Sequence, residues 1–391
     1  MKQQTSLAFF PALPLLTLLA SVFFLNFLSR IALAPLLPVV EADLGLNHGQ
    51  SGALFLIAAL GNAIGLVLSG FISSRLGHRR TIVFSSLGLG LMVVFTSLAE
   101  DPAWFRTALF GLGVTAGTYL PSGIASITTL VRREDWGKAV AVHEAAPNGS
   151  YVLAPLFAEA VLAWTGWRQA LLVLGAAQVV IAVAFLLLGN TTRDKGSPPS
   201  PRVVRGLTRR GMFWLLALFF ALGVGGSFMP YSMLPLYLVD LGWARPEVNQ
   251  LLAASRVGAF FLPFLSGWLG DRIGVKPMIV AVFGLNALAL AGLGLASGTT
   301  LAVLVVIQPM FAVMFFPPGF AALSNLFGPE ERSTAVSLII PMAVFTGIGA
   351  MPLFVGVLGD RGLFHLGFLI IAGAVLAGVF LVGLLRVDKA E

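Results

Sequence analysis

The chain has 391 residues, of which 58% are hydrophobic and only 10% charged, and a mean hydropathy of +0.93. A soluble fold could not bury so much apolar surface. The sequence has no cysteine, which excludes a disulfide framework, a thiolate metal site and a cysteine nucleophile. The four histidines show no metal-ligand spacing, so we expect neither a metal site nor a cofactor.

Apolar runs that are long enough to cross a bilayer, about 20 residues each, recur along the whole chain. We expect twelve transmembrane helices, at about residues 11–39, 51–73, 81–99, 103–131, 138–164, 168–189, 212–239, 248–270, 277–297, 300–327, 333–358 and 362–386. The first run is too long for a signal peptide and contains Asn26 and Arg30, so we interpret it as a retained helix.

One long polar segment, residues 191–211, interrupts this pattern and is rich in Pro, Ser, Gly and Arg. It predicts a flexible cytoplasmic linker between an N-terminal six-helix bundle, residues 1–190, and a C-terminal six-helix bundle, residues 212–391.

The two halves resemble each other in sequence. A shift of 197 residues aligns LPVVEADLG (Leu37–Gly45) with LPLYLVDLG (Leu234–Gly242), and further on a shift of 196 aligns Pro121 with Pro317. Chance similarity of apolar segments is the alternative, but turn residues and charges also align. Related halves of equal orientation imply a pseudo-two-fold axis along the membrane normal and a cavity near the midplane.

The net charge of +7 raises the question of nucleic-acid binding, and the positions of the basic residues argue against it. Of the 24 Lys and Arg, 18 fall at the termini or in every second loop, 3 in the opposite loops and 3 within spans. This asymmetry predicts that both termini are cytoplasmic.

Two loops carry related motifs, GFISSRLGHRR (Gly70–Arg80) and GWLGDRIGVK (Gly267–Lys276). They resemble the loop signature of the major facilitator superfamily, roughly Gly-x-Leu-x-Asp-Arg-x-Gly-Arg-Arg/Lys. The number of spans, the repeat, the linker and the charge bias fit that family over the full chain. The resemblance implies an all-α membrane protein with the MFS fold and 12 transmembrane helices in two pseudo-symmetric six-helix bundles.

The resemblance also implies that these loops act as a conformational latch, in which the Asp faces a helix N-terminus. Ser74 stands where the first motif would have the Asp, so we expect a latch that is charged on one side only. The alternative is a turn that merely orients two helices. The latch residues are Gly70, Arg75, Gly77, Gly267, Asp271, Arg272 and Gly274.

Arg30 and Arg256 lie within spans, where a charge costs at least about 2.5 kcal/mol and should face a cavity or a partner. Both fall slightly outside the midplane in opposite halves, so they could converge on one anion, which a guanidinium binds with two parallel hydrogen bonds. These positions resemble those of arginines in monocarboxylate, oxalate, organic-anion and organophosphate carriers. Alternatively, each arginine pairs with a carboxylate or with backbone carbonyls and stabilises helix packing.

His143 and Glu144 are candidates for proton coupling, because burial raises the proton affinity of Glu and a nearby carboxylate raises that of His. Alternatively, Glu144 complements the dipole of its helix. Other polar residues of the spans are candidates for substrate binding or, alternatively, for helix packing. They are Asn26, Tyr119, Asn148, Tyr231 and Gln308.

The sequence therefore predicts a secondary transporter of a small organic anion of the carboxylate type, working by alternating access and coupled to protons. A proton-driven efflux antiporter for drugs or other hydrophobic compounds is the alternative. No catalytic cluster or nucleotide-binding loop supports an enzyme. We expect a monomer in the lipid bilayer of the cell inner membrane, with the anion and protons as partners and no nucleic acid.

Overall fold

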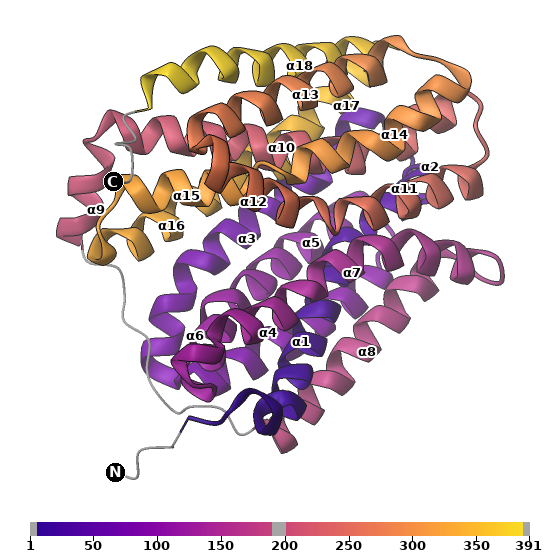
Figure 1. The fold of residues 1–391 in the computed structure, drawn as a ribbon. Coiled ribbons are helices and arrows are strands. Elements are labelled where there is room, and N and C mark those ends of the chain that lie inside the picture. Colours follow the sequence, from indigo (N-terminus) through magenta and orange to yellow (C-terminus); the bar gives the residue numbers. More distant parts are fainter. Residues whose placement is uncertain (1–5, 190–200, 386–391) are drawn as a thin grey trace. The chain divides into compact units, whose positions relative to one another are not determined.

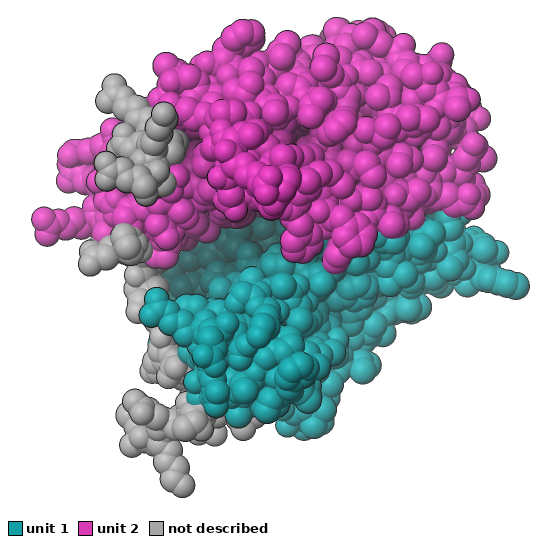
Figure 2. All heavy atoms as spheres, in the orientation of Figure 1, with its two compact units in different colours: residues 1–36, 57–198 teal, residues 37–56, 199–391 magenta. Residues whose placement is uncertain are grey.

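The computed structural model describes residues 6–189 and 201–385. Every regular element within these ranges is helical, and the one strand-like contact there is an isolated bridge between Leu7 and Val131. The predicted all-α fold is confirmed. The chain divides into two compact units (Figure 2): unit 1 comprises residues 1–36 and 57–198, and unit 2 comprises residues 37–56 and 199–391.

Unit 1 is a bundle in which α1 packs along α7, and α4 packs against both α5 and α8 (Figure 1). Helix α3 begins in unit 2 and continues into unit 1 from residue 57. The helices are α1 (Phe9–Ile31), α3 (His48–Leu76), α4 (His78–Ser97), α5 (Pro102–Gly117), α6 (Tyr119–Leu130), the 3₁₀ turn η1 (Arg133–Asp135), α7 (Trp136–Leu162) and α8 (Trp167–Leu188).

Unit 2 is organised around α10, which is buried along most of its length and contacts α11, α14, α16 and α18 (Figure 1). Most of α2 (Leu33–Leu44) also belongs to this unit. The other helices are α9 (Pro201–Thr208), α10 (Gly211–Asp240), α11 (Arg245–Ala259), α12 (Leu262–Ile273), α13 (Val275–Leu295), α14 (Gly298–Val313), α15 (Phe316–Leu326), α16 (Pro329–Ala343), the π-helix η2 (Val344–Ala350), α17 (Met351–Gly359), α18 (Phe364–Leu381) and η3 (Val382–Leu384).

The linker that the sequence predicts over residues 191–211 contains α9, an eight-residue helix. Residues 190–200 lie outside the described residues. The division into bundles of residues 1–190 and 212–391 stays a prediction, and residues 37–56 have their contacts in unit 2.

Four predicted spans are each divided into two helices, and in each a proline early in the second helix stands four residues after the last residue of the first. Proline has no N–H to donate to the carbonyl four residues earlier, and its ring crowds that carbonyl, so the helix ends there. The helix ends and their prolines are Ile31 with Pro35, Gly117 with Pro121, Ala259 with Pro263, and Val313 with Pro317. A fifth span, predicted at 333–358, is interrupted instead by the π-helix η2.

Turn glycines repeat between the halves and support the predicted pseudo-symmetry. Gly45 and Gly242, which a shift of 197 aligns, have φ angles of +61° and +86°. Gly77 and Gly274, aligned by the same shift, have φ angles of +78° and +92° and precede α4 and α13. Since residues with a Cβ rarely adopt this conformation, the glycines fix the same turn in both repeats.

Eleven helical stretches within the described ranges, of 20 to 36 residues, are long and apolar enough to cross a membrane. They match eleven of the twelve predicted spans. Helix α7 covers the remaining span and has 27 residues, among which His143, Glu144 and Asn148 are polar. Large apolar side chains such as Leu288 and Phe380 are exposed on the helix surfaces, as expected where lipid replaces water.

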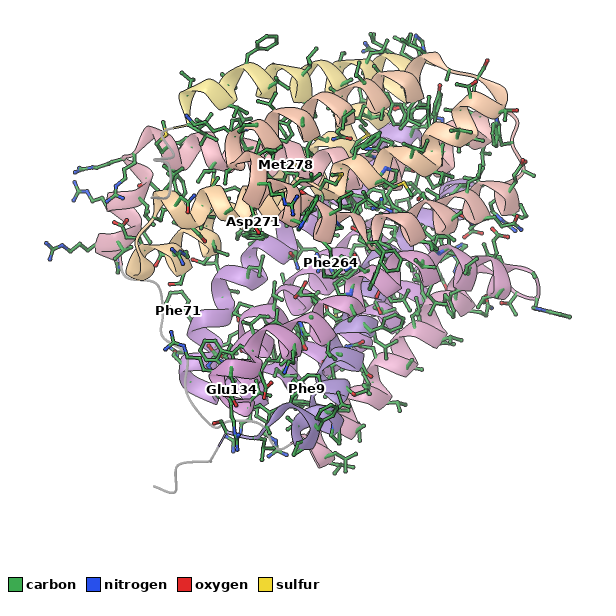
Figure 3. The ribbon with its side chains drawn as sticks, in the orientation of Figure 1. Phe9, Phe71, Glu134, Phe264, Asp271 and Met278 are labelled. Carbon is green, nitrogen blue, oxygen red and sulfur yellow. The ribbon has the colours of Figure 1, made fainter. Side chains whose placement is uncertain are left out.

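The first described residues, at Leu7 and Phe9, are attached to the segment between α6 and α7. The Leu7 N–H donates to the Leu130 carbonyl at 2.9 Å, and the Phe9 N–H donates to the Asp135 carboxylate at 3.1 Å. Lys138 Nζ also donates to Asp135, at 2.9 Å. This ammonium, helped by the Phe9 N–H, lowers the pKa of Asp135 below its usual value. Figure 3 labels Phe9, whose N–H makes this contact, and Glu134, the residue before Asp135.

Candidate functional site

Arg256 is buried in α11 of unit 2, with 4% of its surface exposed. Its Nη2 donates to the Ser227 carbonyl at 3.0 Å, and its Nη1 lies 3.4 Å from Ser227 Oγ. The guanidinium carbon lies 4.8 Å from the centre of the Tyr231 ring, within the range of a cation–π interaction. The backbone carbonyl that the packing interpretation requires is therefore present, and Arg256 and Tyr231, each predicted to bind substrate, lie in contact.

Gln308, predicted from the sequence, lies beside the same stretch of α10. Its Nε2 donates to the Gly226 carbonyl at 2.7 Å and to Asn286 Oδ1 at 2.8 Å. Within the described part of the chain, its Oε1 has no hydrogen-bond partner. A Cβ at Gly226 would lie 2.4 Å from the Asn286 amide nitrogen, so a glycine is needed where α10 and α13 approach.

Sequence reasoning missed Ser227 and Asn286. Asn286 stands alone among apolar residues in the sequence FGLNALALAG, and this isolated amide was a usable signal. Ser227 gave less signal, because its backbone carbonyl rather than its side chain makes the shorter contact with Arg256.

Arg30 and Asn26 lie on α1 in unit 1. The guanidinium carbon of Arg30 is 5.4 Å from the centre of the Phe27 ring, which itself packs edge-on against Tyr151 at 5.3 Å. Among the described residues, no carboxylate forms an ion pair with Arg30, so the interpretation of this arginine as part of a structural ion pair finds no support there. Asn26 is 1% exposed, and its Nδ2 has no hydrogen-bond partner in the described ranges.

A second group in unit 1 joins α1, α6 and α7. The ring of Phe23 stacks on those of His143 and Tyr119, at centroid distances of 4.3 and 5.2 Å. Tyr119 Oη donates to the Leu19 carbonyl at 2.9 Å and lies 3.1 Å from His143 Nε2. Tyr119, expected to bind substrate, is thus a neighbour of the proposed proton group, and Phe23 was missed.

His143 and Glu144 are in contact, as predicted. Nδ1 of His143 lies 3.3 Å from Oε1 of Glu144; the histidine is buried, and the glutamate side chain is half exposed. Asn148 Nδ2 donates to the Glu144 carbonyl one turn away, at 2.9 Å. The structure therefore places Asn148 with the candidate proton group, and its observed hydrogen bond is to its own helix.

The loop motifs form the predicted tight turns through Gly77 and Gly274. Asp271 lies exposed near the C-terminal end of α12 (Figure 3), and the Arg272 guanidinium carbon lies 3.9 Å from the Trp268 ring centre. Ser74 donates to the Phe71 carbonyl of its own helix at 2.8 Å. The latch itself, with Gly70, Arg75 and Gly267 as its further members, stays a prediction.

Comparison with known proteins identifies the family. The sequence matches the Major Facilitator Superfamily over residues 19–255 and 224–391. It is 31% identical to human monocarboxylate transporter 11 over 340 residues, 81% of this chain and 70% of that protein. It is 21% identical to a probable nitrate transporter of Staphylococcus epidermidis over 379 residues, 94% of each chain.

The fold agrees with this assignment. A crystal structure of a bacterial homologue of the human lysosomal transporter Spinster, in an inward-facing and occupied conformation, has a TM-score of 0.79 at 17% identity. The alignment covers 96% of this chain and 97% of that one. Together, the helical architecture, the repeated turns and these matches show that the chain belongs to the major facilitator superfamily and is a multi-pass membrane transporter rather than an enzyme.

Proposed function

We propose that this transporter moves a small organic anion of the carboxylate type across the cell inner membrane by alternating access, coupled to protons. The observation that carries the proposal is Arg256, a buried guanidinium that a backbone carbonyl and an aromatic ring hold in place within a predicted span.

Arg256 suits an anion for physical reasons. A guanidinium stays charged in an apolar environment, so it attracts an anion strongly where water is scarce. Its contacts with Ser227 and Tyr231 restrict its orientation before substrate arrives, which lowers the entropic cost of binding. The amide of Gln308 in α14 donates to the carbonyl of Gly226, the residue before Ser227, and so adds a polar group to the same region of unit 2.

The names of the relatives support an anion as substrate. One is a monocarboxylate transporter and the other a probable nitrate transporter. Carboxylate and nitrate are both planar anions with oxygens that match the paired N–H groups of a guanidinium. We favour the carboxylate type because the monocarboxylate relative is the more similar in sequence.

Arg30 is proposed as a second anion-binding group. Its charge lies over Phe27 with no carboxylate partner in the described part of unit 1, which leaves it available to an anion. Asn26, one turn earlier on α1, offers a buried Nδ2 donor. That Arg30 and Arg256 bind the same anion stays a prediction.

For the proton, we propose the group of His143, Glu144 and Tyr119. His143 lies between a carboxylate at 3.3 Å and a hydroxyl at 3.1 Å, so a proton on the imidazole has an acceptor on either side. Because Glu144 is half exposed, it can exchange that proton with solvent while His143 stays buried.

The remaining expectations form part of the same proposal. The distribution of Lys and Arg supports cytoplasmic termini, and the two loop motifs support a latch that involves Asp271. We propose a monomer, because each unit has its own buried core and the candidate groups lie within single units.

Uptake into proteoliposomes tests the function. Under an imposed pH gradient, the parent protein should accumulate one of lactate, oxalate, a sugar acid, a phosphate ester or nitrate, and not a cationic dye. Arg256→Lys keeps the charge but loses the planar fork, and we expect transport to fall about 10- to 100-fold, since a hydrogen bond to a charged group contributes about 1.5–3 kcal/mol.

Arg106→Lys is the matched control, because it makes the same exchange in another predicted span without touching the Arg256 contacts. It should transport like the parent. Normal anion uptake by Arg256→Lys would contradict the proposal that this residue binds the anion. Transport of the dye alone would favour the efflux antiporter.

A further inference from the structure

His48, the first residue of α3, lies between carboxylates from two other helices of unit 2. Its Nδ1 is 2.8 Å from Oε1 of Glu41 in α2. Its Nε2 is 3.0 Å from Oδ2 of Asp240, the last residue of α10. None of these residues belongs to the anion or proton groups proposed above.

The geometry specifies how many protons the ring carries. A neutral imidazole donates from one nitrogen only, and its other nitrogen presents a lone pair. Here each nitrogen lies at ion-pair distance from a carboxylate oxygen, 2.8 Å for Nδ1 and 3.0 Å for Nε2, so both contacts are attractive only for the imidazolium. Ser51 Oγ donates to the other Glu41 oxygen at 2.5 Å, which fits an ionised Glu41 that acts as an acceptor.

The other groups around His48 also favour a positive charge. Asp360, at the end of α17, is the third carboxylate that acts on it, and one of its oxygens accepts the Gly49 N–H at 3.1 Å. α18 contributes the ring of Phe364, 5.0 Å away. The positive end of α3 and the negative end of α10 meet at His48 and offset each other, so the carboxylates decide its state.

The start of α3 packs against α17 without spare room. A Cβ at Gly52 would lie 2.5 Å from the Pro352 carbonyl oxygen, and one at Gly356 would collide with the His48 carbonyl oxygen. Backbones this close cannot slide past each other while remaining in contact. The start of α3 is therefore either packed on α17 or separated from it.

We propose that His48, Glu41 and Asp240 form a proton-binding site, and that the bound proton holds the start of α3 against α10 and α17. Loss of the proton leaves a lone pair facing a carboxylate at one of the two contacts, which weakens the attachment. The distribution of Lys and Arg predicts that this site faces the outside, so external pH would control it. Within the described residues, no group of three His, Asp or Glu could hold a metal ion instead.

The repeat provides a useful comparison. A shift of 197 places Arg245, the first residue of α11, at the position of His48, and Asp43 at the position of Asp240. One half thus has a permanent cation where the other has a titratable one. The fold accepts an arginine at the start of the equivalent helix, which makes His48→Arg a suitable substitution.

Thiol accessibility tests the site without measuring transport, because the natural chain has no cysteine. Leu54→Cys places a thiol at a fully buried position of α3 within unit 2, and Trp164→Cys places one at a position that is 89% exposed. Each is treated with a membrane-impermeant maleimide from about pH 5.5 to pH 9, a range that brackets histidine titration. The ratio of the two rates removes the pH dependence of the thiol itself.

We expect the labelling rate of Leu54→Cys, divided by that of Trp164→Cys, to rise roughly tenfold or more from low to high pH, because charge-assisted contacts are lost. With His48→Arg added, the ratio should stay at its low-pH level, and with His48→Gln it should be high throughout. His365→Gln is the matched control, an exposed histidine of unit 2, and should behave like the parent. A flat ratio in the parent, or the same pH response with His48→Arg, would overturn the proposal whether or not the chain transports anions.

Discussion

Gly347→Ala tests whether the packing of η2 against α10 supports the Arg256 region. A Cβ at Gly347 would lie 2.5 Å from Gly225 N and 2.9 Å from Gly225 Cα, whereas ordinary contacts begin at 3.4 Å. The two helices must therefore separate by about 0.9 Å, because both colliding atoms belong to the backbone and cannot turn away. Overpacking of this kind costs about 1–3 kcal/mol.

The displacement should affect transport as well as stability. Gly225 lies two residues before Ser227, whose carbonyl holds Arg256 at 3.0 Å. We expect Gly347→Ala to melt at a lower temperature in detergent and to transport more slowly at temperatures where it remains folded. Gly284→Ala is the control: a Cβ there meets no atom within 4 Å, and alanine favours a helix by about 1 kcal/mol. Equal melting temperatures and equal transport for Gly347→Ala and the parent would refute this reasoning.

Two further predictions concern titratable groups. Glu144→Gln removes the half-exposed carboxylate beside His143. A pH gradient should then no longer drive accumulation of substrate, while transport of substrate down its own gradient persists. A variant that still concentrates substrate would exclude Glu144 from proton coupling. Asp135 has a lowered pKa, so it stabilises the attachment of the N-terminal segment above the pKa of the unfolded state, and this contribution disappears as the pH falls through the lower, folded-state value. The protection factor of the Phe9 N–H, which compares its exchange rate with that of an unfolded amide at the same pH, should therefore fall in acid. Asp135→Asn should show the low protection factor already at neutral pH, and unchanged protection would count against the contact.

The fold could be predicted well because membrane spans leave a strong signal. Hydropathy located the spans, and the turn glycines Gly77 and Gly274 were correctly interpreted, since few residues other than glycine adopt a positive φ. The breaks within spans were also encoded, by Pro35, Pro121 and their counterparts. Other prolines, such as Pro147 and Pro230, lie inside continuous helices, so a proline alone did not reveal where a helix ends.

The site was less predictable because its contacts join residues that are distant in sequence. The pairing of His143 with Glu144 was found because they are adjacent. The contact of Tyr119 with His143 required the packing of α6 against α7. Arg256 was identified by the cost of burying a charge, but its main partner is a backbone carbonyl, which any residue at position 227 would supply.

The matched turn glycines also have a consequence for the history of the chain. A tandem duplication begins with two identical copies, so every residue starts with a twin. At a shift of 197, Gly45 aligns with Gly242 and both adopt a positive φ angle, whereas Arg30 aligns with Ser227 and Arg256 aligns with Ala59. The two halves thus share the turns, while the membrane arginines stand at positions where the halves differ. A substitution at an arginine position therefore changes a side chain of one half and leaves the turns that both halves share unaltered.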